Sequence, residues 1–82
     1  MNYEIRFHPK WEEYLCKIKD REIEKRIFKL ILRHERGDVS CRHIRFGKDY
    51  FVEEIGQYRL TFFKNGQSKV FCFVGKHKEY ER

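Results

Sequence analysis

Apolar and polar residues alternate from Tyr3 to Phe7, and this period of two predicts a half-buried strand. Pro9 ends the strand because proline has no backbone N–H to donate to a ladder. From about Lys10 to Lys19, apolar residues recur at the spacing of one helical face, which predicts a short first helix. These residues are Trp11, Tyr14, Leu15 and Ile18.

A second predicted helix has clear signals at both ends. Asp20 suits the N-cap, and Glu22 and Glu24 follow in the first turn, where the helix dipole favours acids. Basic residues occupy the last turn, and Gly37 suits the position just after it. We expect the two helices to form a hairpin. The apolar stripe of the second helix consists of Ile23, Ile27, Leu30, Ile31 and His34, widened by Phe28 and Leu32.

Three apolar runs between residues 50 and 76 are separated by two turn signals. Gly56-Gln57 suits a two-residue type II′ turn, and Asn65-Gly66 is typical of a tight hairpin. The sequence therefore predicts an antiparallel three-stranded meander. A basic segment, residues 41–46, precedes it and is either a short strand or an extended lead-in. The predicted fold class is α+β, in the order β-α-α-β-β-β, with the helices on one face of the sheet.

The two turns also predict which side chains share a face of the meander. The first turn places Glu54 opposite Arg59, and the second places Arg59 opposite Cys72. One face is then bulky and apolar, apart from Glu53, and we expect it to pack on the helices. Its members are Phe51, Ile55, Tyr58, Leu60, Phe62, Phe71 and Phe73.

The other face of the meander is mixed, and Arg59 lies at its centre. A cation surrounded by aromatic and small residues suits a phosphate with bases stacked around it. Glu54 and Arg59 equally fit a simple cross-strand ion pair on a solvated face. The other members of this face are Tyr50, Val52, Thr61, Phe63, Val70, Cys72, Val74 and Lys76.

The composition narrows the class of partner. The 82 residues form a single domain and include 19 Lys and Arg against 13 acids, a formal net charge of +6. This charge favours nucleic acid or an acidic protein as partner, although it also serves solubility. The odd number of cysteines predicts free thiols in a reducing cytoplasm. No apolar run reaches the ~20 residues that a membrane span needs. Cys41-Arg42-His43 lacks the second ligand pair of a metal site.

Two motifs resemble the RelE/ParE toxin superfamily. They are Gly56-Gln57-Tyr58-Arg59-Leu60 and the ending Val74-Gly75-Lys76-His77-Lys78-Glu79-Tyr80. The ending is most similar to the HigB and YafQ branches, in which Gly-x-His follows the last strand. The order of elements also fits, so the resemblance covers nearly the whole chain.

The resemblance implies the toxin of a type II toxin–antitoxin pair, with a cognate antitoxin as partner. In the RelE-like branch it implies a metal-independent endoribonuclease without cofactor, which cleaves mRNA in the ribosomal A site and so inhibits translation. Arg59 corresponds to the arginine of Tyr-Arg-Leu, His77 to the basic position after the last strand, and Tyr80 to the tyrosine of the tail. RelE carries lysines on the strand before the Tyr-Arg-Leu turn, and this chain has Tyr50, Val52 and Glu54 on that strand instead. This difference shifts the implied chemistry towards His77 and Glu54.

These residues suit metal-free RNA cleavage. His77 titrates near neutral pH and suits a general base or acid, while Arg59 can grip phosphate oxygens bidentately. Glu54 is either the second acid–base group or the partner that orients Arg59, and Tyr80 either stacks on a base or assists proton transfer. The predicted RNA-binding residues are Arg42, Arg45, Lys48, Lys76 and Lys78. The alternatives are a ParE-like gyrase inhibitor, an inactive binding protein of this fold, or a small basic nucleic-acid-binding domain.

Overall fold

The computed structural model describes residues 2–37, 42–43 and 50–76. The elements follow the predicted α+β order, and the basic segment predicted as a short strand or a lead-in contains a short strand before the meander. They are β1 (Glu4–Phe7), α1 (Trp11–Cys16), α2 (Arg21–Arg36), β2 (Arg42–His43), β3 (Tyr50–Ile55), β4 (Tyr58–Asn65) and β5 (Ser68–Lys76).

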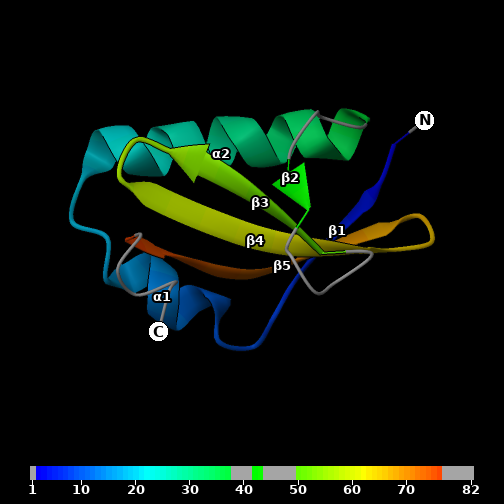
Figure 1. The fold of residues 1–82 in the computed structure, drawn as a ribbon, viewed down its shortest axis with the longest axis horizontal. Helices are drawn as coiled ribbons and strands as arrows, with labels where there is room; N and C mark the ends of the chain where they lie inside the picture. The colour runs from blue at the N-terminus through cyan, green and yellow to red at the C-terminus, as the bar shows by residue number, and fades with distance from the viewer. Residues whose placement is uncertain (1, 38–41, 44–49, 77–82) are drawn as a thin grey trace.

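The strands form one sheet in the order β1-β5-β4-β3-β2 (Figure 1). The predicted antiparallel meander β3-β4-β5 is confirmed, and β1 pairs with β5 in parallel. α2 contacts β1 and β3, whereas α1 contacts β5. β1 pairs with β5 only from Ser68 to Phe71, and beyond that stretch Tyr14 of α1 contacts Phe73 of β5.

Local capping and apolar spacing determine the two helices. α1 ends at Cys16, earlier than predicted, yet Ile18 in the link after it is buried at 4% exposure. At the start of α2, Asp20 Oδ1 accepts hydrogen bonds from the backbone N–H groups of Glu22 (3.0 Å) and Ile23 (3.3 Å), which confirms the predicted cap. The buried face of α2 is Ile23, Ile27, Ile31 and His34.

The prediction for the second hairpin was wrong: the turn lies one residue later, which shifts the strand pairing by two residues. Asn65 pairs with Ser68, so the turn residues are Gly66 and Gln67, and Gly66 has φ +62°. A type I′ turn at Asn65-Gly66 would need a positive φ at Asn65 as well, and none of the described non-glycine residues has one. The shift places Phe62 opposite Phe71, with ring centroids 5.2 Å apart in the centre of the core.

A β-bulge in β5 corrects the predicted faces further. Thr61 pairs with Phe73 while Phe62 pairs with Phe71, which leaves Cys72 as the extra residue. Beyond the bulge the side chains of β5 exchange faces. Val74 is therefore buried in the core instead of on the mixed face, and Phe73 leaves the core face on which it was predicted. The first hairpin, with Gly56 at φ +60° and Ile55 opposite Tyr58, agrees with its prediction.

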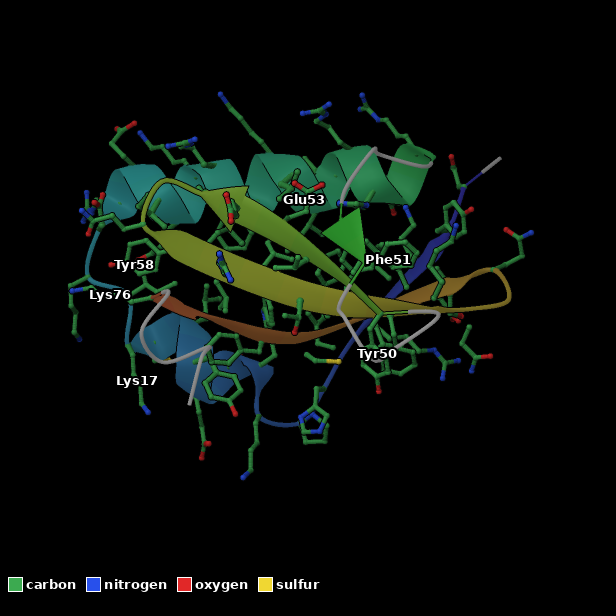
Figure 2. The ribbon with its side chains drawn as sticks, in the orientation of Figure 1. Lys17, Tyr50, Phe51, Glu53, Tyr58 and Lys76 are labelled. Carbon is green, nitrogen blue, oxygen red and sulfur yellow. The ribbon has the colours of Figure 1, made fainter. Side chains whose placement is uncertain are left out.

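Glu53, the acidic exception on the apolar face, belongs to a buried polar cluster against α2 (Figure 2). Its Oε1 lies 3.5 Å from His34 Nε2, and Lys69 Nζ lies 3.1 Å from His34 Nδ1. Lys69 also donates to the carbonyl oxygens of His34 (2.9 Å) and Gly37 (2.7 Å). The ammonium therefore satisfies carbonyls that the end of α2 would leave without partners.

Candidate functional site

Arg59 and Glu54 are neighbours across the first hairpin, as predicted. They occupy opposite positions on β4 and β3, and Arg59 Nη2 lies 3.0 Å from Glu54 Oε1. The arginine side chain is only 17% exposed, whereas that of the glutamate is 50% exposed. The sheet therefore holds the guanidinium in a fixed place, and the carboxylate is the more accessible partner.

The observed register brings Arg59 nearer to the end of β5 than the sequence predicted. Its neighbour on β5 is Gly75 instead of Cys72. A glycine at that position places no side chain beside the guanidinium, and the chain reaches residue 77 two positions later. This end of the sheet therefore combines a held cation with the start of the tail that carries His77 and Tyr80.

An aromatic pair lies on the same face of the sheet as Arg59. Tyr50 is opposite Phe63, and their ring centroids are 5.1 Å apart. Tyr50 is 43% exposed and lies at the end of the sheet opposite to Tyr58 (Figure 2). Because side chains alternate along a strand, Phe63 and Arg59 share this face with one intervening position, the buried Thr61. The face thus offers a cation and partly exposed rings.

The remaining predicted site residues are separated along the sheet or lie outside the described residues. Arg42 pairs with Val52 at the edge, and Lys76 ends β5 opposite Tyr58. The outer position of Arg42 places its backbone two strands away from that of Arg59. The predicted residues outside the described ranges are His77, Tyr80, Arg45, Lys48 and Lys78.

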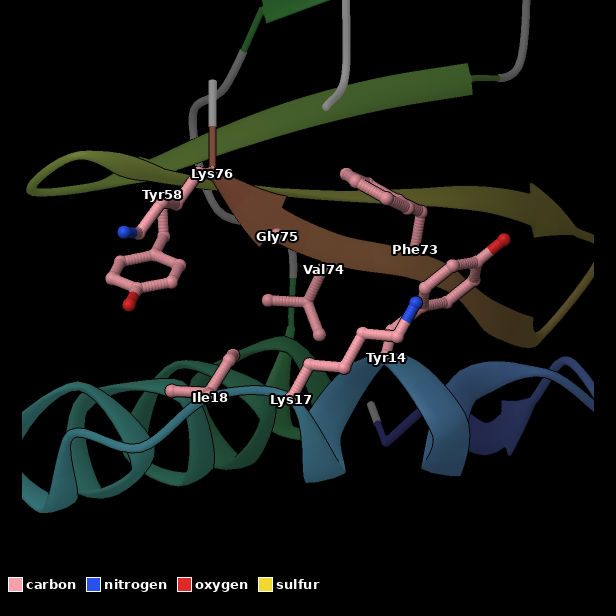
Figure 3. Close-up of a pocket in the computed structure, with 8 residues that line it drawn as sticks. All are labelled: Tyr14, Lys17, Ile18, Tyr58, Phe73, Val74, Gly75 and Lys76. Atoms are coloured by element: carbon pink, nitrogen blue, oxygen red, sulfur yellow. The ribbon is translucent and has the colours of Figure 1, made fainter. Parts of the chain in front are cut away.

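A cleft that the sequence analysis missed lies between α1 and the end of β5 (Figure 3). Its volume is about 410 Å³, and aromatic rings and lysines from both elements line it. Lys76 and Tyr58 form the rung next to that of Arg59 and Gly75. Only the packing of α1 beside β5 brings these residues together. The described lining residues are Tyr14, Lys17, Ile18, Tyr58, Phe73, Val74, Gly75 and Lys76.

The pKa values of Glu4 and Cys72 are shifted from their usual values. The Ser68 hydroxyl, which donates to Glu4 Oε1 at 2.9 Å, and then Arg6 hold the pKa of the Glu4 carboxyl below its usual value. Burial raises the pKa of the Cys72 thiol at the bulge. The Cys72 thiol is therefore in its protonated, less nucleophilic form at neutral pH.

The described residues hold neither a cluster of metal ligands nor a helix that could span a membrane. In residues 2–37, 42–43 and 50–76, no three His, Cys, Asp or Glu side chains gather as metal ligands would. None of the helices in this part of the chain combines the length and apolar character that crossing a bilayer requires.

The fold that carries this site is that of the RelE toxins. A chain of the RelB–RelE antitoxin–toxin complex from Methanococcus jannaschii superposes with a TM-score of 0.81 at 20% identity, covering 93% of this chain and 94% of that one. A chain of the toxin–antitoxin complex RelBE2 from Mycobacterium tuberculosis gives a TM-score of 0.62 at 21% identity, covering 94% and 100%. No protein-family model matches the sequence, and no curated protein matches it significantly.

The chain therefore has the RelE-like fold that its sequence predicted, with strand, helices and meander in the same order. The narrower resemblance of its ending to HigB and YafQ stays a prediction.

Proposed function

We propose that this protein is the toxin of a type II toxin–antitoxin pair and that it cleaves mRNA, with the ribosomal A site as the place of action. The observation that carries the proposal is the position of Arg59. This arginine lies within a RelE-like sheet and pairs with Gly75, two residues before His77 at the start of the tail. Its guanidinium has the geometry that grips the non-bridging oxygens of a phosphate.

The proposed reaction is attack of a ribose 2′-oxygen on the adjacent phosphorus. The bond to the 5′-oxygen breaks, which leaves a 2′,3′-cyclic phosphate and a 5′-hydroxyl. Arg59 stabilises the charge that grows on the phosphate. His77 and Glu54 take the 2′-hydroxyl proton and protonate the leaving oxygen, and a positioned pair of this kind contributes about 10²–10⁴-fold per group. Tyr80 assists by stacking or by proton transfer.

The face around Arg59 suits a single strand of RNA. Tyr50 and Phe63 offer rings on which bases stack in a sequence-tolerant way. The charge of +6 attracts the phosphate backbone, and this attraction weakens as salt is added. Arg42, Arg45, Lys48, Lys76 and Lys78 are the proposed electrostatic contacts.

The experiment is cleavage of a defined mRNA by the purified chain with and without ribosomes, in parallel with Arg59→Ala and His77→Ala. Primer extension locates the cuts, and end analysis detects the cyclic phosphate. We expect cleavage by the wild type and a loss of at least 100-fold in each variant. Arg33→Ala is the matched control, since it removes one exposed arginine from α2. Normal cleavage by both site variants would refute the assignment of residues.

The proposed partner is an antitoxin with an acidic amphipathic segment. Phe28 and Leu32 form an apolar pair at i and i+4 on α2, and each is 52% exposed. Lys25 lies three residues before Phe28, and Lys29 lies three residues before Leu32. Arg36 follows Leu32 by four residues, so basic side chains border one side of the pair. On the other side Glu24 and Glu35 border it. Exposed apolar side chains beside cations suit a helix with apolar and acidic positions.

The Glu54–Arg59 ion pair also favours a second candidate, a ParE-like or inactive binding protein. A guanidinium that already pairs with a carboxylate and is largely buried is less available to a phosphate. A DNA supercoiling assay with gyrase separates the two candidates. Inhibition of gyrase with mRNA left intact would favour the binding protein.

A further inference from the structure

The cleft between α1 and β5 has the shape and chemistry of a small-ligand site. Its volume of about 410 Å³ is within the range of ligand pockets, roughly 300–1,000 Å³. Tyr14 and Lys17 come from α1 and its C-terminal cap, and Tyr58 and Val74 from the sheet above it (Figure 3). The Tyr14 and Phe73 rings make an edge-to-face contact at 4.8 Å, which holds one wall in place.

The charged side chains among the described lining residues of the cleft are both lysines. Lys17 and Lys76 line it from opposite elements and both are exposed, and none of its described lining residues is acidic. Tyr14, Tyr58 and Phe73 are all half-buried, so their rings are partly accessible. A ligand that contacts both the lysines and the aromatic rings needs an anion next to a planar ring, as a nucleotide has.

The cleft is also close to Arg59 in the register of the sheet. Tyr58–Lys76 and Arg59–Gly75 are consecutive rungs of the β4–β5 ladder. Successive side chains of a strand point to opposite faces, so Tyr58 faces the helices and Arg59 the opposite side. A polynucleotide held at Arg59 can therefore reach the cleft by passing over this end of the sheet.

We propose that this cleft binds one nucleotide of the RNA strand, its base against the tyrosine rings and its phosphate at Lys17 and Lys76. The inference rests on the proposed function, because it names a second subsite for the same RNA. An acidic peptide is the rival occupant, since it would satisfy the lysines without using the rings as a stacking surface.

The test is an NMR titration of the ¹⁵N-labelled full chain with adenosine 5′-monophosphate. We expect saturable shifts that cluster at the amides of Lys17, Phe73, Gly75 and Lys76, and weaker ones with adenosine or inorganic phosphate alone. Scattered shifts, or shifts that inorganic phosphate reproduces fully, would overturn the proposal. Equal shifts with a short polyglutamate peptide and none with adenosine would assign the cleft to an acidic peptide instead.

Two sets of variants separate charge from stacking. Lys17→Glu should weaken nucleotide binding at least tenfold, whereas Lys19→Glu makes the same charge change two residues away, outside the cleft lining. Tyr14→Phe keeps the ring and should retain binding, whereas Tyr14→Leu should lose about tenfold. Circular dichroism verifies that each variant is folded. Equal binding by Lys17→Glu and Lys19→Glu would contradict the proposed phosphate contact.

The subsite and the proposed function fail in different ways. If the cleft binds the nucleotide but the wild type cleaves no mRNA, the cleft stands and the ribonuclease proposal fails. If mRNA is cleaved while the cleft amides do not shift and Tyr14→Leu has the wild-type KM for RNA, the cleft proposal fails alone.

Discussion

Lys69 Nζ lies 3.1 Å from His34 Nδ1 in the interior of the protein, where neither side chain is more than 1% exposed. An ammonium can only donate, so Nδ1 is the acceptor and the ring proton is on Nε2, which faces Glu53 Oε1 at 3.5 Å. The same ammonium donates to two carbonyl oxygens at the end of α2. Lys69 therefore joins β5 to α2, and His34 joins α2 to β3, through polar contacts inside an otherwise apolar core.

Lys69→Met should destabilise the protein by about 3 kcal/mol, because it leaves the two carbonyl oxygens and the imidazole nitrogen buried without their donor. Urea unfolding followed by circular dichroism measures the change. The matched control is Lys29→Met on the exposed face of α2, which should change the free energy of unfolding by no more than about 0.5 kcal/mol. Equal effects of the two substitutions would contradict a capping role for Lys69.

Gly66→Ala should destabilise the second hairpin by about 1–2 kcal/mol, since φ is +62° there and a Cβ is strained in that conformation. An added Cβ would meet nothing within 4 Å, so the cost comes from the backbone alone. Gly37→Ala is the matched control, because Gly37 is extended (φ 169°) and equally open. Thermal unfolding of both variants tests the observed turn, and an unaffected Gly66→Ala would contradict it.

Glu54→Gln should reduce mRNA cleavage by about 10²-fold or more, because the amide oxygen still accepts from Arg59 but the amide cannot transfer a proton. Glu54→Ala removes that acceptor and should cost more. Single-turnover rates across pH 5–9 measure both effects. A loss of less than about tenfold in Glu54→Gln, with both limbs of the pH profile kept, would instead identify Glu54 as a residue that only positions Arg59.

Phe28→Asp and Leu32→Asp should each weaken antitoxin binding at least tenfold, because they place a carboxylate in an apolar contact and oppose an acidic partner. The partner for the assay is the protein encoded by the adjacent reading frame, and calorimetry gives its Kd. Phe28→Leu keeps the apolar surface and should bind within about threefold of the wild type. If all three variants bind like the wild type, the antitoxin docks elsewhere.

Thiol reagents should modify the exposed Cys16 faster than Cys72, which is half-buried and has a raised pKa. An unfolded thiol ionises near pH 8.5 while the folded Cys72 keeps its proton, so the free energy of unfolding should fall as pH rises above about 8.5. A Cys41→Ser background simplifies the kinetics, and mass spectrometry assigns the labelled residue. Cys72→Ala should remove its part of the pH dependence, and an unchanged slope would refute it.

Short-range signals were sufficient for much of the fold and for one part of the site. The Asp20 cap, the helical spacing of α2 and the turn at Gly56 each depend on residues within a few positions. The pairing of Glu54 with Arg59 follows from that two-residue turn, so the sequence predicted it correctly. The family motifs likewise depend on local order and spacing.

Long-range packing decided the remainder. Asn65-Gly66 and Gly66-Gln67 are both plausible turns locally, and the choice depends on Phe62 meeting Phe71 and on Lys69 reaching the end of α2. The bulge at Cys72 depends on burying Val74. The cleft exists because α1 occupies the side of β5 that β1 leaves uncovered. The sequence by itself determined the elements and the hairpin that pairs Glu54 with Arg59. Only the tertiary structure decided the register of β4 with β5, the buried lysine and the cleft, because each depends on contacts between residues far apart in the chain.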